Sequence, residues 1–115
     1  MGRGEGELYG LVVRFELVDG HEAAFDRLTA GTVERIRAEE PGTLAYVTHA
    51  EAGSPSARVF YELYRDRAAF EAHEATSHVR RFLSERGQHL RGEPQVWRVR
   101  PIGGLVRPDA GLDGG

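Results

Sequence analysis

The chain has 115 residues, of which 40% are hydrophobic, so it can build one ordinary core but not two. Its net charge of -3 excludes the basic footprint of a protein that binds nucleic acid or an anionic membrane, and a small polar or neutral partner is expected. Cysteine, lysine and asparagine are absent. Their absence excludes thiolate nucleophiles, iron–sulfur clusters, cysteine-bound zinc and Schiff-base chemistry.

Glycine is concentrated near both ends of the chain, where the apolar periodicity also stops. We therefore expect one ordered domain over residues 8–102, with flexible termini at 1–7 and 103–115. No apolar run approaches the length that crosses a membrane, and the first residues lack the apolar segment of a secretion signal. A cytoplasmic protein is expected.

Residues 8–18 alternate between a wholly apolar face and a mixed face, which predicts a β-strand. The apolar face consists of Leu11, Val13, Phe15 and Leu17. Asp19, followed three residues later by Glu22, is typical of a capping box and predicts a helix over residues 20–40, which the Pro-Gly pair at 41–42 ends. The predicted buried face of this helix consists of Phe25, Leu28, Thr29, Thr32 and Ile36.

Residues 43–50 and 58–65 are short runs rich in β-branched and aromatic side chains, joined by a loop over 51–57 that contains glycine and proline. They predict a hairpin. Asp66 predicts the N-cap of a second helix, and Thr76 predicts a second cap that breaks this helix in two. The side chains expected to point inward from it are Phe70, His73, Val79, Phe82 and Leu83.

A final β-rich run over residues 93–102 completes the order β-α-β-β-α-β. This order predicts a ferredoxin-like α+β fold, with one antiparallel sheet and two helices on one of its faces. The other face would expose Val12, Val18, Val59, Leu63 and part of the last strand, which is more apolar area than a small monomer usually leaves in water. We therefore expect a homodimer in which two sheets pack back to back.

Five histidines raise the question of a metal site: His21, His49, His73, His78 and His89. His73 and His78 would lie about 140° apart around one helix, which does not suit a shared ion. Core or solvated histidines are the preferred interpretation, and no metal is expected. His78 lies near a helix start, where the dipole disfavours its charged form, so it is either a neutral base or a half-buried surface histidine.

Tyr46 lies in the first strand of the predicted hairpin, and Phe60, Glu62 and Tyr64 share one face of the second strand. Such a row is either ordinary core packing or the wall of a pocket for a flat, partly polar ligand. A carboxylate at a core-facing position is costly unless it is paired, hydrogen-bonded or in contact with water in a cavity. Arg14 is a possible partner of Glu62, in which case the pair would be structural.

Four motifs occur in a characteristic order: Glu-Pro-Gly-Thr-Leu-Ala-Tyr at 40–46, Phe-Tyr-Glu-Leu-Tyr at 60–64, Asp-Arg-Ala-Ala-Phe-Glu-Ala-His at 66–73 and Ser-His-Val-Arg-Arg-Phe at 77–82. In their order and spacing they resemble the antibiotic biosynthesis monooxygenase family. The resemblance covers residues 11–82 and the final strand, which is nearly the whole predicted domain.

The resemblance implies a dimeric α+β barrel and an oxygenation of phenolic, anthrone or hydroquinone-like substrates by dioxygen, without flavin, haem or metal. The protein would orient the ring, stabilise its anion and exclude water. Tyr64 corresponds to the family's aromatic residue at the end of the third strand, and His73 and His78 correspond to its helix histidines. The resemblance therefore implies that Tyr64 and Tyr46 stack and hydrogen-bond, and that His78 or His73 transfers a proton. The expected substrate-binding residues are Leu11, Val13, Phe15, Phe25, Phe60, Glu62, Phe70 and Phe82.

The haem-degrading branch of the same superfamily uses an asparagine, a tryptophan and an axial histidine. The corresponding positions here carry Val13, Tyr64 and approximately Leu83, so haem degradation is disfavoured. Two alternatives remain open. One is a cofactor-free polyketide cyclase of the same fold, and the other is a non-catalytic dimeric protein that binds a small ligand.

Overall fold

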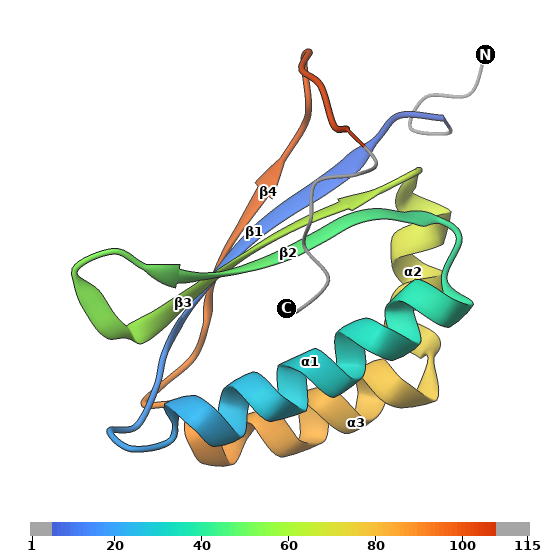
Figure 1. Ribbon diagram of the computed structural model, residues 1–115. Coiled ribbons are helices and arrows are strands. Elements are labelled where there is room, and N and C mark those ends of the chain that lie inside the picture. The colour runs from blue at the N-terminus through green and yellow to red at the C-terminus, as the bar shows by residue number, and fades with distance from the viewer. Residues whose placement is uncertain (1–5, 108–115) are drawn as a thin grey trace.

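Four antiparallel β-strands form one sheet, and three α-helices cover one of its faces in this computed structural model, which describes residues 6–107 (Figure 1). The elements are β1 (Tyr9–Glu16), α1 (Glu22–Glu39), β2 (Thr43–Glu51), β3 (Ser54–Tyr64), α2 (Arg67–Ala75), α3 (Ser77–Glu85), the 3-10 helix η1 (Arg86–His89) and β4 (Gln95–Val99). The strand order across the sheet is β2-β3-β1-β4. The predicted ferredoxin-like fold is confirmed, with its second helix divided into α2 and α3.

Residues 1–5 and 108–115 lie outside the described part of the chain. The predicted flexibility of the termini at 1–7 and 103–115 and the domain bounds of 8–102 therefore stay predictions. Within the described part, no helix is both long enough and apolar enough to cross a membrane.

The core lies between the inner face of the sheet and the helices. Phe15 of β1 is at its centre, with its ring centroid 5.3 Å from that of Phe25 on α1 and 4.7 Å from that of Phe60 on β3. Each aromatic side chain buried in this way contributes about 2 kcal/mol of apolar burial to folding. The helical spacing predicted for α1 is confirmed, because its buried residues are Phe25, Thr29, Thr32 and Ile36.

Two of the three predicted helix caps are confirmed. The side chain of Asp66 accepts a hydrogen bond from a backbone N–H in the first turn of α2, and Thr76 does the same for α3. The predicted cap at Asp19 is wrong. Gly20 adopts a positive φ of 87°, so the chain turns before the helix, His21 becomes the N-cap, and Asp19 instead forms an ion pair with Arg91.

The predicted loop over residues 51–57 is shorter in the structure, because both strands of the hairpin extend into it. β2 ends at Glu51 and β3 already begins at Ser54. Gly53, with a φ of 82°, supplies the left-handed conformation that a tight turn needs at this point. In β3, Arg58 binds both carboxylate oxygens of Asp26, which ties this strand to α1.

The face of the sheet away from the helices carries an apolar row that crosses all four strands. Val47, Tyr61, Val12 and Trp97 are cross-strand neighbours in that order, and the Trp97 side chain is 47% exposed. The prediction that Leu63 faces water is wrong, because it is only 7% exposed. An exposed tryptophan in such a row supports the expectation of a homodimer, which stays a prediction.

Candidate functional site

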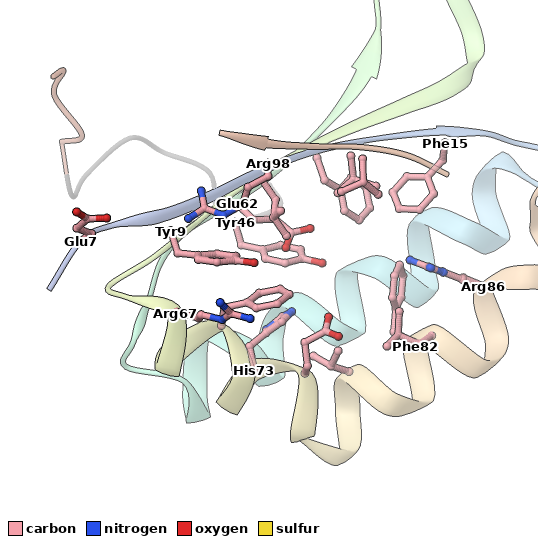
Figure 2. A pocket seen from close by; sticks show the side chains of 18 residues that line it. Glu7, Tyr9, Phe15, Tyr46, Glu62, Arg67, His73, Phe82, Arg86 and Arg98 are labelled. Atoms are coloured by element: carbon pink, nitrogen blue, oxygen red, sulfur yellow. The ribbon is translucent and has the colours of Figure 1, made fainter. Parts of the chain in front are cut away.

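A cavity of about 710 Å³ lies between the inner face of the sheet and the helices α2 and α3 (Figure 2). Its apolar lining consists of Leu11, Val13, Phe15, Phe60, Phe70, Val79, Phe82, Leu83 and Val96. Polar side chains from both layers interrupt this lining: in Figure 2, Glu62 and Tyr46 project from the sheet toward the helices, and His73 of α2 lies on the opposite side of the space. The cavity can therefore enclose a flat apolar molecule and also offers it polar partners.

Nine of the predicted site residues line this cavity: Leu11, Val13, Phe15, Tyr46, Phe60, Glu62, Phe70, His73 and Phe82. The three others, Phe25, Tyr64 and His78, do not line it. Phe25 is fully buried in the core behind Phe15, so the expectation that it lines the pocket is wrong. Tyr64 is connected to the cavity through Glu62, and His78 is connected to it through Glu40 and then His73.

Tyr64 is fully buried and donates its hydroxyl proton to Oε1 of Glu62 over 2.6 Å. Glu62 itself is buried in the cavity wall. Burial raises the pKa of Glu62 to about 7, although the hydrogen bond from Tyr64 acts in the opposite direction. The possible partner Arg14 pairs with Glu51 and Glu16 instead. Glu62 can therefore exchange a proton near neutral pH.

Tyr46 and His73 also belong to the polar part of the cavity wall. The ring centroid of Tyr46 lies 5.7 Å from that of His73 and 5.8 Å from that of Phe60. Burial raises the pKa of the Tyr46 phenol well above its usual range, and the negative charges of Glu62 and Glu40 add to this effect. Tyr46 therefore stays protonated and can donate a hydrogen bond to an anion in the cavity.

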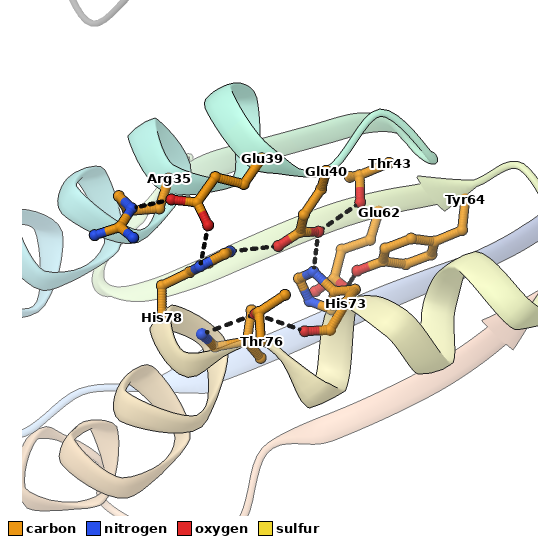
Figure 3. Close-up of polar contacts among 10 residues, drawn as sticks. Arg35, Glu39, Glu40, Thr43, Glu62, Tyr64, His73, Thr76 and His78 are labelled. Atoms are coloured by element: carbon orange, nitrogen blue, oxygen red, sulfur yellow. Dashed lines mark hydrogen bonds and ion pairs between the residues drawn. The ribbon is translucent and has the colours of Figure 1, made fainter.

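Glu40, at the C-terminal end of α1, holds both helix histidines in place (Figure 3). Nδ1 of His73 donates to Oε1 over 2.7 Å, Nε2 of His78 donates to Oε2, and the Thr43 hydroxyl also donates to Oε1. Burial alone would raise the pKa of Glu40, but these three hydrogen bonds outweigh burial and lower it. Glu40 is therefore a carboxylate, and Nε2 of His73 is the ring nitrogen left for a ligand.

Glu40 was not among the predicted site residues. No local pattern in the sequence signals it, because its partner His78 lies 38 positions further along the chain. Arg86 was missed as well. It lines the cavity with its guanidinium carbon 5.6 Å from the ring centroid of Phe15 and 6.0 Å from that of Phe82. A cation at this end can stabilise negative charge that develops on a bound ring.

Among residues 6–107, no three His, Asp or Glu side chains are grouped so that they could hold a metal ion. The oxygens of Glu40 already accept hydrogen bonds from two histidines and a threonine. The expectation that the protein uses no metal and no other cofactor stays a prediction.

The fold and the cavity define the protein as a small ferredoxin-like α+β protein with an aromatic internal site. The model of the antibiotic biosynthesis monooxygenase family matches residues 8–85, and the chain belongs to this family. No curated protein shows significant sequence similarity to the chain.

Solved structures share the fold across nearly the whole chain. A Caulobacter crescentus protein assigned to the same family is 19% identical with a TM-score of 0.81, and the match covers 85% of this chain and 92% of that one. A Pseudomonas aeruginosa protein is 24% identical with a TM-score of 0.76, covering 89% and 100%. A further antibiotic biosynthesis monooxygenase is 26% identical with a TM-score of 0.76, covering 83% and 99%. The predicted family and fold are confirmed.

Proposed function

We propose that the protein is a cofactor-independent monooxygenase that acts on phenolic, anthrone or hydroquinone-like substrates. Family membership and an aromatic cavity of suitable size both support this function. The observation that carries the proposal is Glu62, a buried carboxyl in the cavity wall whose pKa burial raises to about 7. A base that titrates near the working pH is what the first step of such a reaction requires.

In the proposed reaction Glu62 takes the acidic proton of the substrate, and the electron-rich anion passes one electron to dioxygen. The ring radical and superoxide combine to form a carbon–oxygen bond, and the resulting peroxide is protonated. The carbon that carries the peroxide then loses its remaining proton, and the O–O bond breaks to leave a carbonyl and a hydroxide ion. The hydroxide takes up that proton and leaves as water. The substrate supplies all four electrons, and the two protons that it loses end in that water molecule.

The residues around the cavity have separate roles in this proposal. Tyr46 donates a hydrogen bond to the substrate anion, and Arg86 stabilises its charge. Glu40 fixes His73 with Nδ1 as donor, so that Nε2 can take up and return the second proton. Tyr64 acts on Glu62 and not on the substrate, which differs from the stacking role implied by the resemblance. His78 acts only through Glu40.

Oxygen consumption with a set of anthrones and hydroquinones tests the proposal. We expect one dioxygen consumed for each quinone formed, and a loss of turnover of about a hundredfold in Glu62→Gln. Glu34→Gln is the matched control, because Glu34 is exposed on α1 and should leave the rate unchanged. Conversion of the substrate without oxygen consumption would instead identify a cyclase, and binding without any product would identify a ligand-binding protein.

We also propose that two chains pair through the apolar row Val47, Tyr61, Val12 and Trp97. This row lies on the face of the sheet opposite the cavity. Pairing would therefore cover the apolar row and leave each chain with its own complete cavity. Trp97→Glu should halve the mass measured by light scattering, whereas Trp97→Phe should not. A wild-type chain that is already monomeric at high concentration contradicts the pairing.

A further inference from the structure

His78 is buried between α1 and α3, and only one of its ring nitrogens has a hydrogen-bond partner. Nε2 donates to Glu40 (Figure 3). Nδ1 is also buried but has no hydrogen-bond partner within residues 6–107, and Oε1 of Glu39, at 4.0 Å, is beyond hydrogen-bond reach. A buried polar nitrogen without a partner is costly, so a ligand that supplied one would be favoured here.

His78 lines a second hollow, a groove of about 420 Å³ between α1 and α3 that shares no lining residue with the cavity. The lining of this groove is Arg27, Leu28, Gly31, Thr32, Arg35, Ser77, His78 and Arg81. It contains three arginines and no acidic residue, in a chain whose net charge is -3. The charged side chains of the lining are therefore all cationic, and two of them also pair with acids outside the lining.

The three arginines of the groove have donors available. Arg27 has no hydrogen-bond or ion-pair partner among the described residues. Arg35 and Arg81 use Nε for ion pairs with Glu39 and Glu85, one helical turn further along. The terminal guanidinium nitrogens of Arg35 and Arg81 make no hydrogen bond to these two glutamates. They are therefore available to an oxyanion, which arginine binds through more than one of its nitrogens.

Gly31 lies in the interior of α1, where glycine costs about 1 kcal/mol relative to alanine. A Cβ built at this position would meet no atom within 4 Å, and the residue is helical, so neither packing nor backbone conformation requires glycine. What the missing side chain does is keep the wall of the groove open. This is the expected arrangement where a ligand approaches the backbone closely.

The groove also contains the start of α3, a helix of nine residues. Thr76 caps only the N–H of Val79 with its side chain. The N–H groups of Ser77 and His78 belong to the first turn, where backbone donors have no partner within the helix and the dipole favours an anion.

We propose that this groove binds a phosphate-type oxyanion, either inorganic phosphate or the phosphate group of a larger molecule. Nδ1 of His78 is the acceptor left when Nε2 donates to Glu40, so it can accept a hydrogen bond from a protonated oxygen of the phosphate. Two acidic groups lie close to the donors of the groove. Glu39 pairs with Arg35 and lies 4.0 Å from Nδ1 of His78, and Glu85 pairs with Arg81. Arg27 is therefore the lining arginine with no acidic partner among the described residues. The proposal is independent of the reaction in the cavity.

An NMR titration of the full chain tests this site, with inorganic phosphate added at constant ionic strength and pH 7. We expect saturable shifts of the Ser77 and His78 amides and of the His78 ring nitrogens, and much weaker effects with acetate and chloride. Glycerol 3-phosphate separates the two sources: tighter binding than inorganic phosphate assigns the site to a larger phosphorylated molecule, and equal binding assigns it to free phosphate. Identical shifts with all anions overturn the proposal.

Matched variants separate the site from general electrostatics. Gly31→Glu places an acidic group in the groove and should weaken phosphate binding at least about tenfold, while Ala30→Glu, exposed and outside the groove, should change it less than about twofold. Glutamate is a better helix former than glycine, so loss of binding in Gly31→Glu does not reflect unfolding. Equal effects of the two variants contradict the site.

Discussion

Glu40 and Glu62 are two buried carboxyl groups, 9% and 6% exposed, that differ in what surrounds them. Glu40 accepts hydrogen bonds from Thr43, His73 and His78, and its pKa is lowered. Glu62 accepts one from Tyr64, and burial raises its pKa to about 7. The depth of burial and the number of donors together decide the charge state of each group: Glu62 lies deeper in the protein and accepts one hydrogen bond, whereas Glu40 accepts three. Glu40 is a permanent structural anion, whereas Glu62 is able to titrate.

Glu40→Gln should have the largest effect. The substitution removes the charge that two buried histidines require, and it should cost about 4 kcal/mol of unfolding free energy at pH 7. Urea unfolding measures this loss. The neighbouring exposed residue provides the control: Glu39→Gln should cost less than about 0.5 kcal/mol. Similar losses in the two variants would show that Glu40 is not an anchor.

Glu62→Gln should instead increase the free energy of unfolding at neutral and higher pH. The pKa of Glu62 rises from 4.5 to about 7 on folding, so between these values the folded chain binds more protons than the unfolded chain, and stability falls as the pH rises. The total penalty, complete above pH 7, is about 3 kcal/mol. Glutamine keeps the acceptor for Tyr64 but cannot ionise.

Unfolding of Glu62→Gln at two pH values checks this expectation. The variant should be more stable than the wild type at pH 8 by up to about 3 kcal/mol and should show little difference at pH 4, while losing turnover. A variant that is no more stable at pH 8 would indicate that Glu62 has an ordinary pKa in the folded chain.

Tyr64→Phe should have a smaller effect, confined to the titration of Glu62. Loss of the hydroxyl donor should raise the pKa of Glu62, and with it the lower limit of the pH–rate profile, by about one unit. Tyr61→Phe is the matched control. Tyr61 precedes Glu62 in β3 and lies on the opposite face of the strand, so its hydroxyl does not contact Glu62. A lowered rate without a shifted profile would mean that Tyr64 contributes only to packing.

Thr43→Val should have the smallest effect. It removes one of three donors to Glu40, so it should cost about 1 kcal/mol and leave the carboxylate charged at neutral pH. Thr48→Val, at an exposed position of the same strand, is the control for the loss of a hydroxyl in β2. If the cost of Thr43→Val approached that of Glu40→Gln, the three donors would not share the stabilisation.

Most of the fold could be predicted from the sequence because its signals are local. Alternation predicted β1, helical spacing predicted the buried face of α1, and Asp66 and Thr76 each predicted a cap that is present. Two of the errors arose where a glycine backbone conformation decides the outcome. The positive φ of Gly20 displaced the cap from Asp19, and that of Gly53 tightened the hairpin turn.

The site was less predictable because its chemistry depends on contacts between distant segments. The sequence did place Tyr46, Glu62 and His73 at inward positions, and all three line the cavity. Glu40 contacts His78 across 38 positions of the chain, and no local pattern encodes that distance. Arg86 likewise reaches the cavity only because η1 follows directly after α3.

A carbon-13 NMR titration of the glutamate carboxyls in the wild-type chain tests the central claim most directly. Glu62 should titrate with a midpoint near 7, and in the same sample Glu40 should titrate below 4.5. This result would establish a neutral-pH base in the cavity beside a permanently charged anchor. A Glu62 midpoint at or below 4.5 would contradict the account, because Glu62 could then not act as the proposed neutral-pH base.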